Sequence, residues 1–164
     1  MTEGRFPFVA RLRAPLGLLV VVLAGPLAAQ APDPLLGTWK LNVAKSRFSP
    51  LPPPMSQTVR IESVAEGRHK VTNDTVAADG RTAHTEYTAA NDGKDYPMEG
   101  SFLVDTVSGK RIDARTVERT DKKGGKVVQT LRTQASADGK TLTVTIKATS
   151  AQGQAVNVTA VYER

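Results

Sequence analysis

Residues 36–42, Leu-Gly-Thr-Trp-Lys-Leu-Asn, decide the fold of this chain. They include the single tryptophan of the 164 residues and lie between two proline-rich segments. Apolar Trp39 and Leu41 alternate with the polar residues Thr38 and Lys40, which is the period-two pattern of a strand with one buried face. The stretch therefore predicts the first strand of a half-buried sheet.

Downstream of this stretch, glycines followed by a basic or amide residue recur at intervals that fit one strand plus one turn. They are Gly67, Gly80, Gly93, Gly109, Gly125, Gly139 and Gly153. Three of them follow an aspartate, which is a strong hairpin signal because glycine accepts the positive φ of tight turns. Residues 113–115 predict a further turn within one of the longer intervals. The pattern indicates a meander of eight to ten antiparallel strands without a helix.

The segments between these turns alternate as strands do. Residues 141–148 alternate without error, and residues 156–162 place apolar side chains on one face. Four prolines between residues 50 and 54 predict an ordered loop that crosses one end of the domain, because proline cannot donate to a central ladder. Pro97 predicts an edge, a bulge or a loop for the same reason.

A meander of this length has to curl or close, because open sheet edges invite aggregation. Closure would pair the first strand with the last and give an all-β, antiparallel up-and-down barrel of about 8–10 strands. A two-sheet sandwich is the alternative, since alternation does not distinguish the two architectures. The hairpin-length connections favour the barrel.

The first 29 residues have the layout of a secretory signal peptide. Arg5, Arg11 and Arg13 precede an apolar run that ends in small residues near Ala29. A membrane anchor is the alternative, but prolines and glycines interrupt the run, which is shorter than the ~20 residues that a span needs. We therefore expect a signal peptide over residues 1–29 and one domain over residues 30–164. The mature protein would be periplasmic or extracellular, with no stable membrane span.

Composition excludes several classes of function. The chain has no cysteine, so it has neither disulfides nor thiol chemistry. Its formal net charge of +6 includes three arginines of the predicted signal peptide, and the remaining basic residues are too scattered to indicate nucleic-acid binding. Threonine and valine fill most strand positions, so a barrel of these residues would leave interior space for a ligand or water, or would flatten and fill itself.

Both ends of the mature chain resemble a known superfamily. Gly37-Thr38-Trp39 resembles the Gly-x-Trp start of lipocalins, and with Lys40-Leu41 it looks like the opening of fatty-acid-binding proteins. Residues 161–164 resemble the last strand of the latter family. The resemblance implies a lipocalin-like (calycin) barrel that binds a small hydrophobic or carboxylate-bearing ligand in its interior. Export is expected from the signal-peptide layout and departs from the intracellular fatty-acid-binding proteins.

The resemblance also implies which residues would bind the ligand. In fatty-acid-binding proteins an Arg-x-Tyr pair in the last strand holds the ligand carboxylate; Tyr162 matches the tyrosine, but Ala160 stands at the arginine position. Arg132, six residues after Gly125 and Lys126, matches the position of a second arginine of the family. We therefore expect Arg132 and Tyr162 to bind ligand. Neither face of the strand around Arg132 is clearly apolar. A solvent-facing Arg132 is the favoured orientation, because a buried arginine without a partner is costly, and ligand binding requires the inward one.

Three further residues are predicted to close the barrel. Trp39 would plug one end, and a late arginine packs on this tryptophan in lipocalins. Arg164 is the candidate by position, and Gly37 belongs to the same motif. These residues are assigned to structure and not to ligand binding.

No catalytic residue, metal ligand or cofactor is predicted. His69 and His84 are the two histidines, and a metal site would need three or four ligands. Only Glu86 shares a face with His84, although a closed polar constellation around them would favour an enzyme. No nucleophile elbow, phosphate-binding loop or zinc motif occurs. The alternative to a ligand-binding barrel is a non-enzymatic structural or interaction module of the cell envelope without a cavity, whose partner proteins are unknown.

Overall fold

The structure is a computed structural model that describes residue 1, residues 32–150 and residues 153–164. The predicted signal peptide lies, apart from Met1, outside the described residues and stays a prediction. The described residues form these elements: β1 (Gly37–Leu41), η1 (Val43–Lys45), β2 (Arg47–Ser49), β3 (Ser56–Ser63), η2 (Ala65–Gly67), β4 (His69–Val76), β5 (Thr82–Ala89), β6 (Asp92–Glu99), β7 (Thr106–Asp113), β8 (Thr116–Lys123), β9 (Lys126–Ala135), β10 (Thr141–Thr149) and β11 (Ala155–Glu163). Within this described part, no helix has the length and apolar character to cross a membrane.

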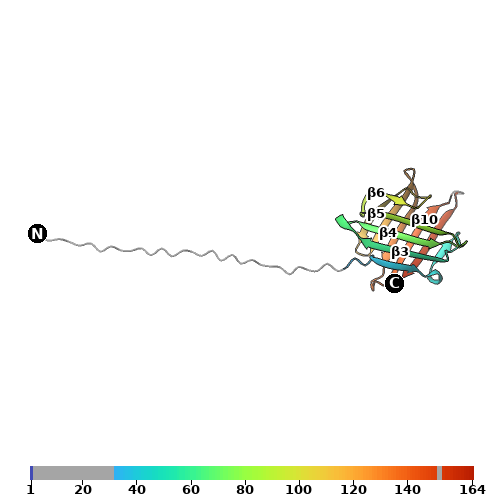
Figure 1. The fold of residues 1–164 in the computed structure, drawn as a ribbon, viewed down its shortest axis with the longest axis horizontal. Helices are drawn as coiled ribbons and strands as arrows, with labels where there is room; N and C mark the ends of the chain where they lie inside the picture. Colours follow the sequence, from blue (N-terminus) through green and yellow to red (C-terminus); the bar gives the residue numbers. More distant parts are fainter. Residues whose placement is uncertain (2–31, 151–152) are drawn as a thin grey trace. The chain divides into compact units, whose positions relative to one another are not determined.

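The strands form one closed antiparallel barrel. From β3 to β11 each strand pairs with the next along the chain, and β1 pairs with both β3 and β11. Lys40 lies opposite Glu163 and Leu41 opposite Tyr162, which joins the first strand to the last. In Figure 1, β3, β4, β5 and β6 lie side by side across the near wall, with β10 on the far wall. The predicted all-β barrel is confirmed, and the sandwich is rejected.

The short strand β2 was not expected from the sequence. It pairs with β11 beyond the point where β1 does, after the single turn η1. Strands β1 and β2 thus act as two halves of one interrupted strand, so the described part of the barrel counts ten strands. The proline-rich residues 50–55 that follow are a loop at one end of the barrel, as the prolines predicted.

Alternating strand directions give the barrel two different ends. The proline-rich loop, the β4–β5 turn (residues 77–81), the β6–β7 loop (residues 100–105) and the β8–β9 turn lie at one end, which we call the mouth. The start of β1, the start of β4, the end of β7 and the C-terminus lie at the opposite end, which we call the closed end. The predicted turn at residues 113–115 separates β7 from β8 there.

Trp39 fills the closed end. Its side chain is 0% exposed, and its indole Nε1 donates to the carbonyl oxygen of Leu35 at 3.0 Å. The guanidinium of Arg164 lies 4.2 Å from the centroid of the indole ring. Gly37 adopts a φ of +126°, a backbone conformation that disfavours residues with a Cβ. Together these residues hold the beginning of β1 against the end of β11.

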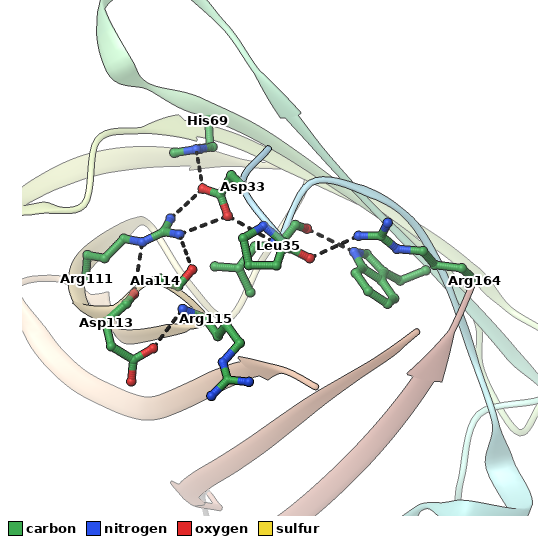
Figure 2. A network of polar contacts seen from close by, with 10 residues as sticks. Asp33, Leu35, His69, Arg111, Asp113, Ala114, Arg115 and Arg164 are labelled. Carbon is green, nitrogen blue, oxygen red and sulfur yellow. Dashed lines mark hydrogen bonds and ion pairs between the residues drawn. The ribbon is translucent and has the colours of Figure 1, made fainter. Parts of the chain in front are cut away.

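A polar network ties the residues before β1 across the closed end (Figure 2). Both carboxylate oxygens of Asp33 accept from Arg111, at 2.6 and 2.9 Å, and His69 Nε2 lies 3.5 Å from Asp33. Burial raises the pKa of Asp33, but the hydrogen bonds from Arg111 and the Leu35 amide outweigh it, so the pKa lies below its usual range. Arg164 donates to the backbone carbonyl of Leu36 at 2.6 Å. The closed end is therefore sealed by both apolar and charged contacts.

The sheet is weakest around β6. Only two residue pairs join β5 to β6, and the β6–β7 register shifts between Asp92 and Asp95. Pro97 lies inside β6 opposite Thr106, so the irregularity predicted for this proline occurs beside it and not at it. Gly100 ends the strand with a φ of +75°, and a Cβ there would lie 2.1 Å from the carbonyl oxygen of His84. Glycine is required at this position because of that close approach.

Candidate functional site

The barrel encloses a cavity of about 580 Å³. Side chains from β3, β4, β5, β8, β9, β10 and β11 line it, and Leu51, Pro52 and Pro54 of the proline-rich loop border it at the mouth. Asp79 and Arg81 lie on the same rim and pair with each other at 2.7 Å. The volume falls within the range of small-molecule sites, ~300–1,000 Å³. The interior space that small side chains made conceivable is therefore present.

Most of the cavity wall is apolar. The inward positions of each strand follow the period-two alternation, so apolar side chains predicted for one face meet across the interior. Apart from the residues at the mouth, the apolar lining consists of Phe48, Val59, Ile61, Val71, Met98, Leu131, Leu142, Val144, Ile146, Val158 and Ala160. An apolar molecule placed here would lose water contacts on nearly every side.

A chain of polar side chains crosses one wall. Tyr162 Oη donates to Gln57 Oε1 at 2.5 Å, and Gln57 Nε2 donates to Thr75 Oγ1 at 3.1 Å. Thr75 Oγ1 in turn lies 3.4 Å from Asn73 Oδ1. Tyr162 is 4% exposed, and burial raises the pKa of its hydroxyl, which therefore stays protonated at neutral pH. This wall offers hydrogen bonds without charge.

An ion pair occupies the wall formed by β5, β8 and β9. Arg119 Nε and Nη2 donate to the two oxygens of Asp121 at 2.7 and 2.9 Å, and Arg119 Nη1 donates to Tyr87 Oη at 2.9 Å. Gln129 Nε2 donates to Asp121 at 2.6 Å. Burial lowers the pKa of Arg119, but Tyr87 and Asp121 outweigh it and raise the pKa above its usual value. Arg119 is therefore a cation that donates to both oxygens of the Asp121 carboxylate.

The two residues predicted to bind ligand lie in different places. Tyr162 lines the cavity. Arg132 lies on the outer face of β9, where it donates to Glu118 Oε1 at 2.7 Å and its side chain stays 46% exposed. The inward neighbour is Leu131, which is 8% exposed. Arg132 thus has the solvent-facing orientation that the sequence favoured, because Leu131 takes the buried position and Glu118 offers Arg132 a partner outside. Its assignment as a ligand-binding residue is corrected.

Sequence reasoning missed Arg119, the arginine that does line the cavity. A signal was present: Val117, Arg119 and Asp121 fall on one face of a strand, and the two opposite charges are spaced to pair on it. Arg119 lies on β8, whereas the family resemblance directed attention to β9.

The remaining candidates lie away from the cavity. Gly37, Trp39 and Arg164 are at the closed end, in the contacts described above. His69 faces Asp33 at that end, and His84 is on the outside of β5, where its Nδ1 contacts Asp74 at 2.5 Å. Within the described part of the chain, no group of three or more His, Cys, Asp or Glu side chains is arranged to hold a metal ion.

Comparison with known proteins gives a fold and no sequence family. No family model and no curated protein matches the amino-acid sequence. The crystal structure of wild-type fluorescent protein UnaG matches with a TM-score of 0.53 and 15% identity, covering 79% of this chain and 96% of UnaG. A point mutant of UnaG matches with a TM-score of 0.54 and 16% identity, covering 80% and 96%.

Zebrafish ileal bile acid-binding protein, crystallised with cholic acid, matches with a TM-score of 0.49 and 16% identity, covering 80% of this chain and 99% of that chain. At the level of the fold, the likeness to UnaG confirms the expectation drawn from the two chain ends. The chain has the closed antiparallel β-barrel fold that UnaG has.

Proposed function

We propose that this protein is an exported calycin barrel that binds a small hydrophobic molecule in its interior. The observation that carries the proposal is the cavity of about 580 Å³, apolar over most of its wall and bordered by loops only at the mouth. Export is supported by the signal-peptide layout of residues 1–29.

A binding role fits the interior better than catalysis does. Most polar side chains that line the cavity take part in hydrogen bonds with other side chains, and neither histidine is in the lining. Catalysis by general acid and base would need a titratable group poised near neutral pH, and the pKa of Tyr162 is raised away from neutrality by burial. Carboxylate binding through Arg132 is not supported, because that side chain lies outside the barrel.

The proposal is tested with a neutral solvatochromic dye such as 1-aminoanthracene, titrated into the mature protein and displaced by hydrophobic compounds. We expect saturable binding at one site. The variant A160F places a bulky ring in the cavity, from a position that is 1% exposed, and should weaken dye binding by at least about tenfold.

The matched control is V161F, which adds the same ring on the outer face of β11 and should leave dye binding unchanged. Equal weakening by both variants, or a wild-type protein that binds neither the dye nor any compound of a broad hydrophobic panel, would refute a ligand-binding interior.

A second candidate function is supported by the mouth. Phe102 and Leu103 are 84% and 63% exposed at the tip of the β6–β7 loop, where Ser101 Oγ accepts from the amides of Leu103 and Val104. A rigid turn that holds two apolar side chains in water is typical of an interaction surface. If the protein is an interaction module of the cell envelope, F102S should abolish its function in the cell and A160F should not. If it is a ligand-binding barrel, A160F should abolish that function and F102S should not.

A further inference from the structure

The ion pair inside the barrel leaves the cavity without net charge. Arg119 and Asp121 lie two positions apart on β8, with side chains 18% and 0% exposed. The guanidinium of Arg119 donates to both carboxylate oxygens of Asp121. Among residues 32–150 and 153–164, the other charged residues in the lining are Asp79 and Arg81, which pair with each other at the rim. A ligand in this cavity therefore meets no uncompensated cation.

Asp121 does not face the ligand space, whereas Arg119 does. Asp121 accepts from Arg119 twice and from Gln129 once, behind the lining. Arg119 has five N–H donors, of which two bind Asp121 and one binds Tyr87. Two guanidinium N–H groups thus have no hydrogen-bond partner among the described residues, on a side chain that lines the cavity. A buried ion pair is a weak source of stability compared with apolar packing, which favours a role in recognition.

Tyr87 adds a third donor to the same place. Its oxygen accepts from Arg119 at 2.9 Å, and the guanidinium lies 5.0 Å from the centroid of its ring. No acceptor for its hydroxyl proton occurs among the described residues, so the proton is available to a ligand. Arg119 and Tyr87 together present donors that match a carbonyl or other oxygen acceptor, in a wall that is otherwise apolar.

The charge of Asp121 decides which acceptor fits. An anionic ligand on Arg119 would put a second negative charge close to Asp121, in a poorly hydrated space where like charges repel strongly. It would also give up its hydration for a cation that is already neutralised. A neutral ketone, ester or amide is not repelled by Asp121 and loses less hydration free energy, and it can accept from the same donors.

We propose that the Arg119–Asp121 pair makes the barrel select uncharged hydrophobic ligands that carry an oxygen acceptor, and discriminate against carboxylates. This inference rests on the proposed function, since it concerns the ligand class of the same cavity. Arg119 and Tyr87 would contact the ligand, and Asp121 would act through Arg119 as a specificity-determining residue.

The test compares two ligands with one skeleton, dodecanamide and dodecanoic acid, at pH 8, as competitors of bound 1-aminoanthracene. In the wild-type protein the amide should displace the dye at a concentration lower by at least about tenfold. D121N removes the opposing charge with little change of shape. It should raise the affinity for dodecanoic acid by about tenfold or more and change the affinity for dodecanamide by less than about threefold.

The matched control is E118Q on the outer face of the same strand, where Glu118 pairs with Arg132; it should leave the ratio of the two affinities unchanged. Y87F removes one donor from the amide and should weaken amide binding about threefold to tenfold, with any change in dye affinity measured by direct titration and used to correct the competition. If D121N fails to give the wild-type circular dichroism spectrum, the wild-type ratio and Y87F decide the matter.

The outcomes separate the two proposals. A protein that binds neither dye nor either ligand refutes the proposed function. A protein that binds the dye but takes dodecanoic acid as well as, or better than, dodecanamide refutes the selection and leaves the binding function standing. A folded D121N variant with the wild-type ratio also refutes the role of Asp121.

Discussion

Replacing Trp39 by alanine should destabilise the barrel by about 3–5 kcal/mol, the range for a buried aromatic truncated in a core. The side chain is 0% exposed, so its whole apolar surface returns to water on unfolding. The variant also leaves the Leu35 carbonyl without its donor and removes the ring beneath Arg164, contacts worth about 1 kcal/mol each within that range. No neighbouring strand can collapse into the space, because Trp39 is fixed at the joint between the first and last strands.

The assay is urea unfolding at pH 7, followed by far-ultraviolet circular dichroism, because W39A lacks the only tryptophan and has no indole fluorescence to follow. With a slope of about 2 kcal/mol/M, the midpoint should fall by about 1.5–2.5 M. W39F is the graded control: it keeps most of the apolar volume but loses the indole N–H, and should cost about 1–2 kcal/mol. A W39A loss below about 1 kcal/mol would show that Trp39 does not close the barrel, and would refute the account of the closed end.

Two further predictions concern the mouth and the closed end. G100A should lower the free energy of unfolding by at least about 2 kcal/mol in the same urea assay, because the new Cβ meets the His84 carbonyl oxygen. G80A is the control: its glycine also has a positive φ but faces open space, so the loss should be about 1 kcal/mol. Equal losses in the two variants would contradict the contact at Gly100. For Asp33, the folded pKa lies below the unfolded one because the hydrogen bonds from Arg111 outweigh burial, so its stabilisation is present above about pH 4 and is lost as pH falls through the folded value. The midpoint gap between wild type and D33N should therefore be widest near pH 7 and shrink toward pH 3, and a gap constant over that range would contradict the linkage.

Local chemistry explains what the sequence could predict. The glycines of the hairpin turns and the strict alternation of residues 141–148 are short-range signals, and both survive in the structure as turns and as an inward apolar face. Closure of the barrel followed from the number of strands and the short connections. The resemblance of the two ends of the mature chain to known barrel families predicted the type of barrel, and the structural likeness to UnaG supports this fold.

The interior polar site was harder to predict because it depends on register. Where neither face of a strand is apolar, alternation does not say which face points inward, and one residue of slip exchanges the two faces. The β8–β9 pair contains such an irregularity between Asp121 and Lys122. The placement of Arg119 inside and Arg132 outside is fixed by pairing across strands, which a single sequence does not display.

The first and last strands of the barrel meet at Trp39, and this makes the protein suitable for circular permutation. Because Arg164 is hydrogen-bonded to the carbonyl groups of Pro34 and Leu36, a short linker from Arg164 to Pro32 would join the two ends of the barrel without crossing the mouth and would keep Asp33 and Leu35. New termini could be opened in the exposed turn at Gly124 and Gly125. Such a circular permutant would carry both of its free ends on the rim of the cavity. A split reporter attached there would report directly on changes at the entrance, whereas tags on the native C-terminus leave the entrance unobstructed for surface capture.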